Sequence, residues 1–524
     1  MSLNQQKIVH HLKDSVSKIT NNKIVQDFFE KQSLQIVQRF PVRFISDFLK
    51  YVEQCIDRSK NNDVLLLENL KHFNTKFNIK RSIVVAPKWN RKSTIISKCS
   101  ISSQTLHTIL SIETAENEDA LLKRIEALIV HLQQYPESRN CAIRAGAIPM
   151  LLRINKKITS DNVKGAIRVA LASLGYANPV ARNGIRILSM DGGGIRGLLI
   201  LEMLKKLEEL TQKRVHELFD LFCGVSTGAI LAFSLGIHHA SLDEIAKHYK
   251  DISFAVFKQS RLWGTGNLVW NQAFYDTSLW EKKLREHLGT STLIDTNRNS
   301  HCPKLCAISA VVNQSHLSAF VFRNYSPPWK VKPQYFGSSE HEVWQAARAS
   351  AAAPTIFEEY KLGNFLHQDG GILVNNPTAV ALHEAKLIWP NTPIQCVVSF
   401  GTGRTVPTPT DSVKRTPDDS SNTSWAHKFY KILDSATDTE GVHVMLSDLL
   451  PHNVYYRFNP YLTEMISMTE INPQKLEQLQ RDTIMYLRRN EDKFQEAAKV
   501  LIEKKTCVQK CKDFINFNRE IYNI

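Results

Sequence analysis

Residues 184–236 read GIRILSMDGGGIRGLLILEMLKKLEELTQKRVHELFDLFCGVSTGAILAFSLG, and this stretch decides the fold class. Two short apolar runs, 185–190 and 221–225, each lead through a glycine-containing turn into an apolar helical pattern. Later segments continue the alternation, with expected strands at 303–312, 319–323, 365–368 and 395–400, and expected helices at 341–352 and 378–388. Strands that alternate with helices predict an α/β domain with a mostly parallel central sheet.

The rest of the chain divides into regions of different character. We expect a basic helical N-terminal region and linker over 1–105, an armadillo-like helical region over 106–180, and the α/β domain with a helical C-terminal tail over 181–524. The armadillo-like expectation rests on 146–154, where a proline falls in the first turn of an expected helix. One or two such helical units cannot bury their apolar faces alone. We therefore expect them to dock on the α/β domain. Residues 476–503 predict one long helix over the sheet.

Charge is concentrated at the start of the chain. The 524 residues have a formal net charge of +15, and residues 1–100 carry 18 Lys and Arg against 8 Asp and Glu. No zinc-finger, RRM or KH signature accompanies this charge, so we expect no nucleic-acid partner and favour an anionic membrane surface. Trp89, which stands among Lys88, Arg91 and Lys92, suits a lipid headgroup region, and an ordinary exposed loop is the alternative. The first twenty residues suit a weak organelle presequence or an interfacial helix, with a plain packed amphipathic helix as the alternative.

Cysteine usage and hydropathy exclude other classes. Nine Cys, an odd number without a CxxC pair, predict reduced thiols in an intracellular compartment rather than a disulfide scaffold or a zinc site. The start of the chain lacks the apolar core of a secretory signal. The longest uncharged run, 221–242, is better explained as strand, turn and helix than as a membrane span.

The segment Gly224-Val-Ser-Thr-Gly228 fits G-x-S-x-G between an apolar strand and an apolar helix. Such a turn holds its serine in a strained conformation, and glycine on both sides lets neighbouring elements approach. Ser226 is therefore the candidate nucleophile. The alternative is an N-cap serine in an ordinary turn.

A serine hydroxyl needs a base before it can attack. The candidate histidines are His301, His341, His367 and His383, and none lies in a glycine-bounded turn. Asp369 ends a short strand and is followed by Gly370 and Gly371. We therefore consider a direct Ser226–Asp369 dyad, with the pKa of the aspartate raised by burial. An ordinary Asp-Gly turn is the alternative.

The segment Asp191-Gly-Gly-Gly-Ile-Arg-Gly197 supplies successive backbone N–H groups before a helix. Gly192, Gly193 and Gly194 would let a substrate oxygen come close, so they are the candidate oxyanion hole. Arg196 would contact a phosphate or anchor the loop. Gly192, Gly194 and Gly197 also satisfy G-x-G-x-x-G, which is the dinucleotide-binding pattern, although the acid Asp220 precedes the second strand instead of ending it.

Three motifs in this order, DGGGIRG, GVSTG and DGG, resemble the patatin-like phospholipases. The stretches WQAARASAAAP, LHQDGGILVNNPTAVALHE and SATDTEGVHVML are similar to the calcium-independent phospholipase A2 gamma branch of that family. The resemblance implies a three-layer patatin-like domain, a Ser226–Asp369 dyad without a catalytic histidine, and an oxyanion hole at Gly192–Gly194. It implies calcium-independent hydrolysis of glycerophospholipid esters through an acyl-serine intermediate, with no metal and no cofactor.

Several expectations accompany this resemblance. A neutral-lipid lipase or a transacylase would use the same dyad, and a non-enzymatic scaffold is the alternative from another class. Because the substrate is a membrane lipid, we expect an interfacial surface, with Trp263, Leu268, Val269 and Trp270 as candidates for the pocket rim; a buried aromatic cluster is the alternative. We expect an intracellular, membrane-associated protein on a mitochondrial or other organelle membrane, and a possible homo-oligomer. The chain ends in Ile521-Tyr-Asn-Ile524, so no C-terminal Ser-Lys-Leu signal is expected to act.

Overall fold

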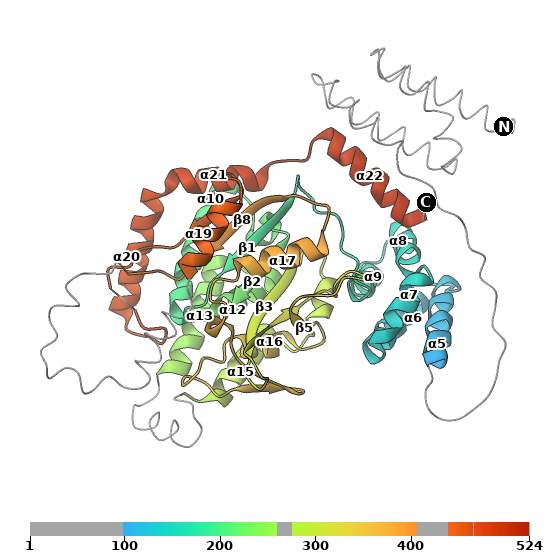
Figure 1. Ribbon diagram of the computed structural model, residues 1–524, viewed down its shortest axis with the longest axis horizontal. Coiled ribbons are helices and arrows are strands. Elements are labelled where there is room, and N and C mark those ends of the chain that lie inside the picture. Colours follow the sequence, from blue (N-terminus) through green and yellow to red (C-terminus); the bar gives the residue numbers. More distant parts are fainter. Residues whose placement is uncertain (1–97, 259–274, 406–438, 465, 523–524) are drawn as a thin grey trace, which may run out of the picture. The chain divides into compact units, whose positions relative to one another are not determined.

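The structure is a computed structural model, and it describes residues 98–258, 275–405, 439–464 and 466–522 (Figure 1). The chain divides into two compact units, of which one spans Ile101–Glu503 and the other combines Met1–Ser100 with Lys504–Ile524. The larger unit carries the sheet and the motifs. In the smaller unit the structure describes the helix α22 (Cys507–Tyr522).

A nine-stranded sheet forms the centre of the larger unit. Its strands are β1 (Ile185–Met190), β2 (Leu221–Val225), β3 (Lys304–Val311), β4 (Ser318–Arg323), β5 (Phe336–Ser338), β6 (Tyr360–Leu362), β7 (Phe365–Asp369), β8 (Ile394–Phe400) and β9 (Tyr455–Phe458). The order is β5-β4-β3-β2-β1-β8-β9, and β6 joins through β7, which pairs with β3. Five pairs are parallel, while β3–β4, β3–β7 and β6–β7 are antiparallel. The prediction of a mostly parallel sheet is therefore confirmed.

Helices cover both faces of the sheet. Between and after the strands lie η3 (Gly194–Gly197), α10 (Leu198–Thr211), α11 (Val215–Leu218), α12 (Thr227–Phe233), η4 (Ser234–His238), α13 (Leu242–Phe257), α15 (Thr277–Leu288), η5 (Ile294–Arg298), α16 (Val343–Ser350), η6 (Gly370–Ile372), α17 (Thr378–Ile388), α19 (Thr439–Leu449), α20 (Pro473–Arg489) and α21 (Glu491–Ile502). Strand β1 is buried throughout, and it divides its side chains between two cores. Leu188 and Met190 pack with α10, α12 and α16, whereas Ile185 and Ile187 pack with α17.

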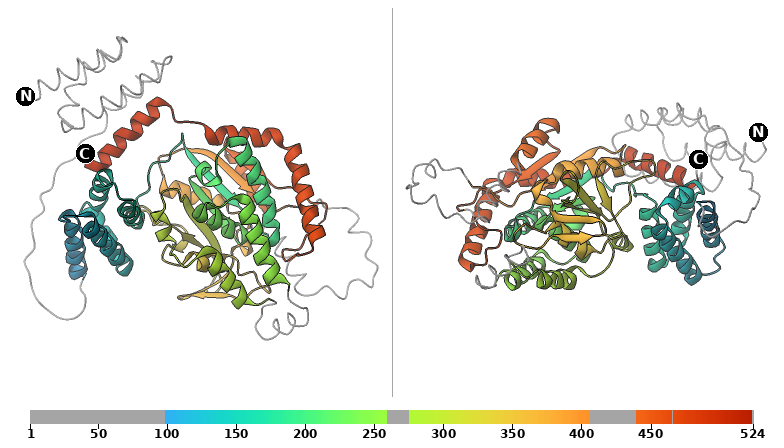
Figure 2. Two further views of the ribbon diagram at one scale, coloured as in Figure 1. Left: turned by 180° about the vertical axis from the view of Figure 1, so that it is seen from behind. Right: turned by 60° about the horizontal axis from the view of Figure 1, so that its bottom comes forward.

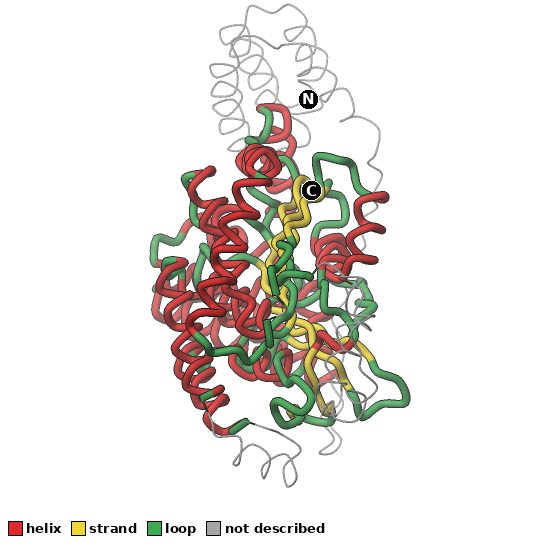
Figure 3. The backbone as a smooth tube through the Cα atoms, turned by 90° about the vertical axis from the view of Figure 1, so that its left-hand side faces the viewer, coloured by secondary structure: helices red, strands yellow, loops and turns green. Residues whose placement is uncertain are grey.

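The sheet and the helices on its two faces form three layers. Helix α17 lies in front of the strands in Figure 1, and the helices α10, α12 and α13 come to the front when the molecule is seen from behind (Figure 2). Seen from the side, the strands run between helices (Figure 3). Because both faces are covered, strands with near-continuous apolar sequences are stable here.

Helices at the start of the larger unit dock on the α/β part. They are α5 (Lys98–Glu113), α6 (Glu118–Gln134), η2 (Pro136–Ser138), α7 (Arg139–Arg144), α8 (Ala147–Lys157) and α9 (Asp161–Ser173). Arg168 of α9 donates from Nε to the carbonyl of Asn297 over 3.1 Å, and Glu126 of α6 pairs with Arg298 over 2.7 Å. The expected docking is thus present.

The prediction of a single long helix over 476–503 is wrong, because α20 and α21 are separate helices with Asn490 between them. Asn490 leaves helical geometry, with φ −117° and ψ 22°. Its side-chain amide donates to the carbonyl of Tyr486 over 2.9 Å. A short amide side chain that bonds to nearby backbone offers the chain an alternative to helix continuation. Buried Phe494 then anchors the second helix in the core.

Candidate active site

Ser226 stands at the bend between β2 and α12. Its φ of 53° and ψ of −121° place a non-glycine residue at positive φ, which costs about 1–3 kcal/mol. A Cβ on Gly224 would lie 2.1 Å from the carbonyl oxygen of Gly228, and a Cβ on Gly228 would lie 2.1 Å from that of Met190. Both glycines are therefore required by close backbone approach. The bend leaves the Ser226 side chain partly exposed.

Ser350, which the sequence analysis missed, holds this bend from behind. The backbone N–H of Ser226 donates to Ser350 Oγ over 2.9 Å, and that hydroxyl donates to the carbonyl of Ile308 over 2.6 Å. Ser350 ends α16 and is fully buried. A serine in an alanine-rich helix carries no sequence signal for such a role, because the contact joins residues far apart in the chain.

Asp369 meets Ser226 because their strands run toward each other along one edge of β3. β2 is parallel to β3 and ends with Val225 opposite Ile308, whereas β7 is antiparallel to β3 and ends with Asp369 opposite Ser309. The two C-terminal strand ends therefore meet at neighbouring positions. The Ser226 side chain interacts with the Asp369 carboxylate and favours its charged form.

The Asp369 carboxyl group is 5% exposed, and burial raises its pKa to about 6. The Ser226 side chain opposes the rise, as does the backbone N–H of Gly371, which donates to the carboxylate over 2.8 Å. Desolvation disfavours the charged carboxylate, so its affinity for a proton increases. A carboxylate with a pKa near 6 is a competent proton acceptor at neutral pH.

The candidate histidines lie elsewhere. His367 is fully buried on β7, and its Nδ1 bonds to Ser309 Oγ over 2.8 Å. His301 lies near the start of β3, at the opposite end of the strand from the position that pairs with Asp369. Within the described ranges no hydrogen bond links a histidine to Ser226. Of the candidate bases, the structure brings Asp369 to the serine.

The glycine loop lies directly against the serine. A Cβ on Gly192 would be 3.1 Å from Ser226 Cβ and 2.6 Å from Asn375 Oδ1, and a Cβ on Gly197 would be 2.2 Å from Thr227 Cγ2. Gly370 and Gly371 form the start of η6 directly after Asp369. The motif glycines thus gather around one point at the ends of β1, β2 and β7.

Carbonyl contacts orient the loop. Thr402 Oγ1 donates to the carbonyl of Gly192 over 2.7 Å, and both Thr227 and Tyr249 bond to that of Gly194 over 2.9 Å. In a trans peptide the N–H points away from the C=O, so the amides of Gly193 and Ile195 point away from these contacts. The backbone N–H of Ile195 donates to the carbonyl of Met468 over 2.9 Å. Within the described chain, the N–H groups of Gly192, Gly193 and Gly194 form no hydrogen bond, as an oxyanion hole requires.

Arg196 and Arg457 fix the two ends of this loop. Arg196 is buried, and its Nε donates to the carbonyl of Gly193 over 3.3 Å, which supports the loop-anchor interpretation of this residue. Arg457 on β9 donates from Nη1 and Nη2 to the two oxygens of Asp191 over 2.9 and 2.6 Å. Asp191 raises the pKa of the Arg457 guanidinium, and both side chains are buried. The sequence analysis did not identify Arg457.

Some expectations fall outside the described residues. Trp263, Leu268, Val269 and Trp270 lie there, as does the basic region with Trp89. Among the described residues, no three His, Cys, Asp or Glu side chains are grouped so as to hold a metal ion. No described helix is both long and apolar enough to cross a bilayer.

Comparisons with known proteins agree with this arrangement. The family model described as patatin-like phospholipase matches residues 188–382, which contain all three motifs. Calcium-independent phospholipase A2-gamma of Mus musculus is 45% identical over 429 residues, covering 82% of this chain and 54% of that protein. The Homo sapiens protein of the same name is 44% identical over 433 residues, with coverage of 82% and 54%. Phospholipase A I of Arabidopsis thaliana is 30% identical over 400 residues, covering 66% of this chain and 29% of that protein. The chain thus spans about half the length of the gamma relatives.

Proposed function

We propose that the chain is a calcium-independent phospholipase A-type lipid acyl hydrolase of the patatin-like phospholipase family. The observation that carries this proposal is the meeting of Ser226 and buried Asp369 at adjoining strand ends beside the glycine loop. The names of the gamma relatives support the substrate class and the independence of calcium. No cofactor is part of the proposal.

The reaction would proceed in two steps. In the first, Asp369 accepts the proton of Ser226 while Oγ attacks the ester carbonyl, and the N–H groups of Gly192–Gly194 stabilise the oxyanion. The tetrahedral intermediate expels the lysophospholipid alkoxide, which takes the proton from Asp369. In the second step Asp369 deprotonates a water molecule that attacks the acyl-serine, and the fatty acid leaves as Ser226 recovers its proton.

A membrane surface is the proposed partner, and α19 supports it. This helix exposes Val444, Met445 and Leu449, which are 57%, 49% and 73% exposed. Its start is tied to the loop after Asp369, because Asn376 Nδ2 donates to the carbonyl of Thr439 over 3.1 Å. An exposed apolar helix face suits contact with a lipid surface.

Vesicle binding tests this surface. We expect Val444→Ser and Leu449→Ser to weaken binding to phosphatidylcholine vesicles while turnover of a soluble short-chain ester is kept. Ile484→Ser on α20, where the side chain is 45% exposed, is the matched control. Equal binding by all three variants and the wild type would contradict a role of α19 in membrane contact.

Finer parts of the proposal concern organisation and location. We assign 1–105 to a basic helical region and linker, 106–180 to an armadillo-like scaffold and 181–524 to the catalytic part with its tail. The short helices α7–α9, with Gly146 at φ 85° before α8, support the armadillo-like assignment. We also propose an organelle membrane, such as the mitochondrial one, as the location, homo-oligomers as a possible assembly, and no nucleic-acid partner.

The deciding experiment is product analysis on phosphatidylcholine vesicles in excess chelator. We expect the wild type to release fatty acid and lysophosphatidylcholine, and Ser226→Ala to lose about 10³-fold or more of this activity. Ser234→Ala, a buried serine on the segment after α12, is the control. Triacylglycerol cleavage in preference to phospholipid, or acyl transfer to an added lysophospholipid, would favour the lipase or transacylase alternative. Full activity in Ser226→Ala would contradict the mechanism.

A further inference from the structure

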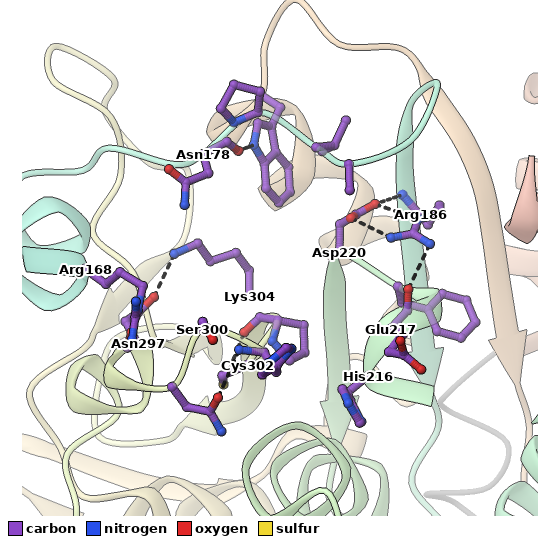
Figure 4. A pocket seen from close by; sticks show the side chains of 18 of the residues that line it. Arg168, Asn178, Arg186, His216, Glu217, Asp220, Asn297, Ser300, Cys302 and Lys304 are labelled. Carbon is purple, nitrogen blue, oxygen red and sulfur yellow. Dashed lines mark hydrogen bonds and ion pairs between the residues drawn. The ribbon is translucent and has the colours of Figure 1, made fainter. Parts of the chain in front are cut away.

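A cavity of about 320 Å³ lies at the end of the sheet where β1, β2 and β3 begin. We call it the strand-start cavity; its wall includes Arg168, Asn178, Arg186, His301, Lys304 and Trp389 (Figure 4). Ser226 follows the other end of β2. Along β3, Lys304 is five residues from Ser309, the partner of Asp369, which is about 17 Å of strand. The cavity is therefore separate from the candidate active site.

Lys304 places a cation in this cavity without a carboxylate partner. Its Nζ donates to the side-chain oxygen of Asn297 over 2.8 Å, and no carboxylate of the described chain pairs with it. Burial lowers the pKa of Lys304 to about 8. An ammonium group has three N–H donors, so one amide oxygen leaves most of its hydrogen-bonding capacity available.

Arg168 adds a second cation on the same side. Its Nε and Nη2 donate to the backbone carbonyls of Asn297 and Arg298. Burial lowers the pKa of Arg168, and the nearby charge of Asp161 opposes this change. In Figure 4, Arg168 and Lys304 approach Asn297 from neighbouring positions, with the Asn178 amide above them. Within the described chain, the side chains of Asn178 and Ser300 form no hydrogen bond and are available as further donors.

The acidic side chains of the wall are already engaged. The Asp220 carboxylate accepts three hydrogen bonds from Arg186. The donors are the backbone N–H of Arg186 at 2.9 Å, its Nε at 3.0 Å and its Nη2 at 2.9 Å. Glu217 accepts from the backbone N–H of Arg214 over 3.1 Å. Arg186 thus balances Asp220. Asp161 acts on Arg168 through its charge, whereas no carboxylate of the described chain pairs with the Lys304 ammonium group.

We propose that the strand-start cavity binds a small phosphate-bearing anion through Lys304 and Arg168. A phosphate offers more acceptor oxygens and more negative charge to the two cations than a single carboxylate does. Its tetrahedral oxygens also accept from the ammonium, the guanidinium and the amide of Asn178 at once. The volume accommodates inorganic phosphate or the phosphate monoester of a small molecule, and these two sources share the recognised group.

Titration of the full chain tests the proposal. Inorganic phosphate and glycerol 3-phosphate are titrated in separate arms by calorimetry, with sodium chloride holding the ionic strength constant. We expect saturable binding. The ligand with the lower Kd, inorganic phosphate or glycerol 3-phosphate, shows whether the cavity recognises free phosphate or a phosphate monoester. Lys304→Met should weaken binding at least about tenfold, the scale of losing one charge-assisted hydrogen bond. Arg168→Gln should weaken it in the same direction.

The control is Lys332→Met, which removes an exposed lysine of the same unit and should bind like the wild type. Ester hydrolysis by Lys304→Met should be unchanged, because the residue is far from Ser226; this also reports that the variant is folded. Absence of saturable binding in both arms, or equal binding by Lys304→Met and the wild type, would overturn the proposal. Neither outcome depends on the hydrolase activity.

Discussion

Ser226 and Asp369 interact because β2 and β7 end head to head on one edge of β3. Each residue alone is an ordinary feature of a strand end. The register of β3, which pairs Ile308 with Val225 and Ser309 with Asp369, turns them into a pair.

The first prediction is a pH profile. Asp369 accepts a proton in its charged form, and its pKa is about 6, so the fraction of competent enzyme falls below that pH. We expect kcat/KM for a soluble short-chain ester to fall about tenfold per pH unit below about 6 and to level off above it. A profile centred near 4, the ordinary value for an aspartate, would contradict the burial argument.

Asp369→Asn should stabilise the protein at alkaline pH. The native state holds the proton of Asp369 more tightly than the unfolded state does, so wild-type stability falls as pH rises from about 4 to 6. Two pKa units correspond to about 3 kcal/mol. Because asparagine carries no charge to bury, we expect the variant to unfold at higher urea than the wild type at pH 8. The advantage should disappear at pH 4, and a less stable variant at pH 8 would refute this reasoning.

Arg457→Met should destabilise the protein strongly. It leaves the Asp191 carboxylate buried without its partner, and loss of one member of a buried pair costs about 3–5 kcal/mol. Since Asp191 precedes the glycine loop, kcat should fall more than KM changes. Urea unfolding and steady-state kinetics measure the two effects.

Arg404→Met is the matched control for this network. Arg404 pairs with Glu440 over 2.7 Å but is 39% exposed, so its loss should cost at most about 1 kcal/mol. Equal costs for the two variants would show that burial of the Arg457–Asp191 pair does not set its importance.

Ser350→Ala should reduce kcat about 10–100-fold with little change in KM. The backbone N–H of Ser226 loses its acceptor and is left unpaired, at about 1–3 kcal/mol, so the strained bend is free to relax. Ser234→Ala also removes a buried hydroxyl, one that bonds to Ile230 and His287 and not to Ser226, and is the comparison. If both variants kept full kcat, Ser350 would have no positioning role.

Local patterns in the sequence predict most elements of the α/β part. Helix α17 begins and ends at the expected residues 378 and 388, because its apolar periodicity has clear boundaries. The expected helix over 476–503 failed at Asn490, where a side-chain bond to Tyr486 competes with helix continuation. Ser350 and Arg457 could not be found from the sequence, since their contacts with Ser226 and Asp191 join distant segments.

By itself, the sequence determined the α/β alternation, the serine bend between two glycines and the glycine loop before a helix. These features depend on residues near one another in the chain, through backbone geometry and side-chain periodicity. Only the tertiary structure decided that Asp369 meets Ser226, that burial raises its pKa to about 6, and that Arg457 anchors Asp191. Those outcomes depend on strand register and on the exclusion of water by both helical layers, which arise when the whole sheet assembles.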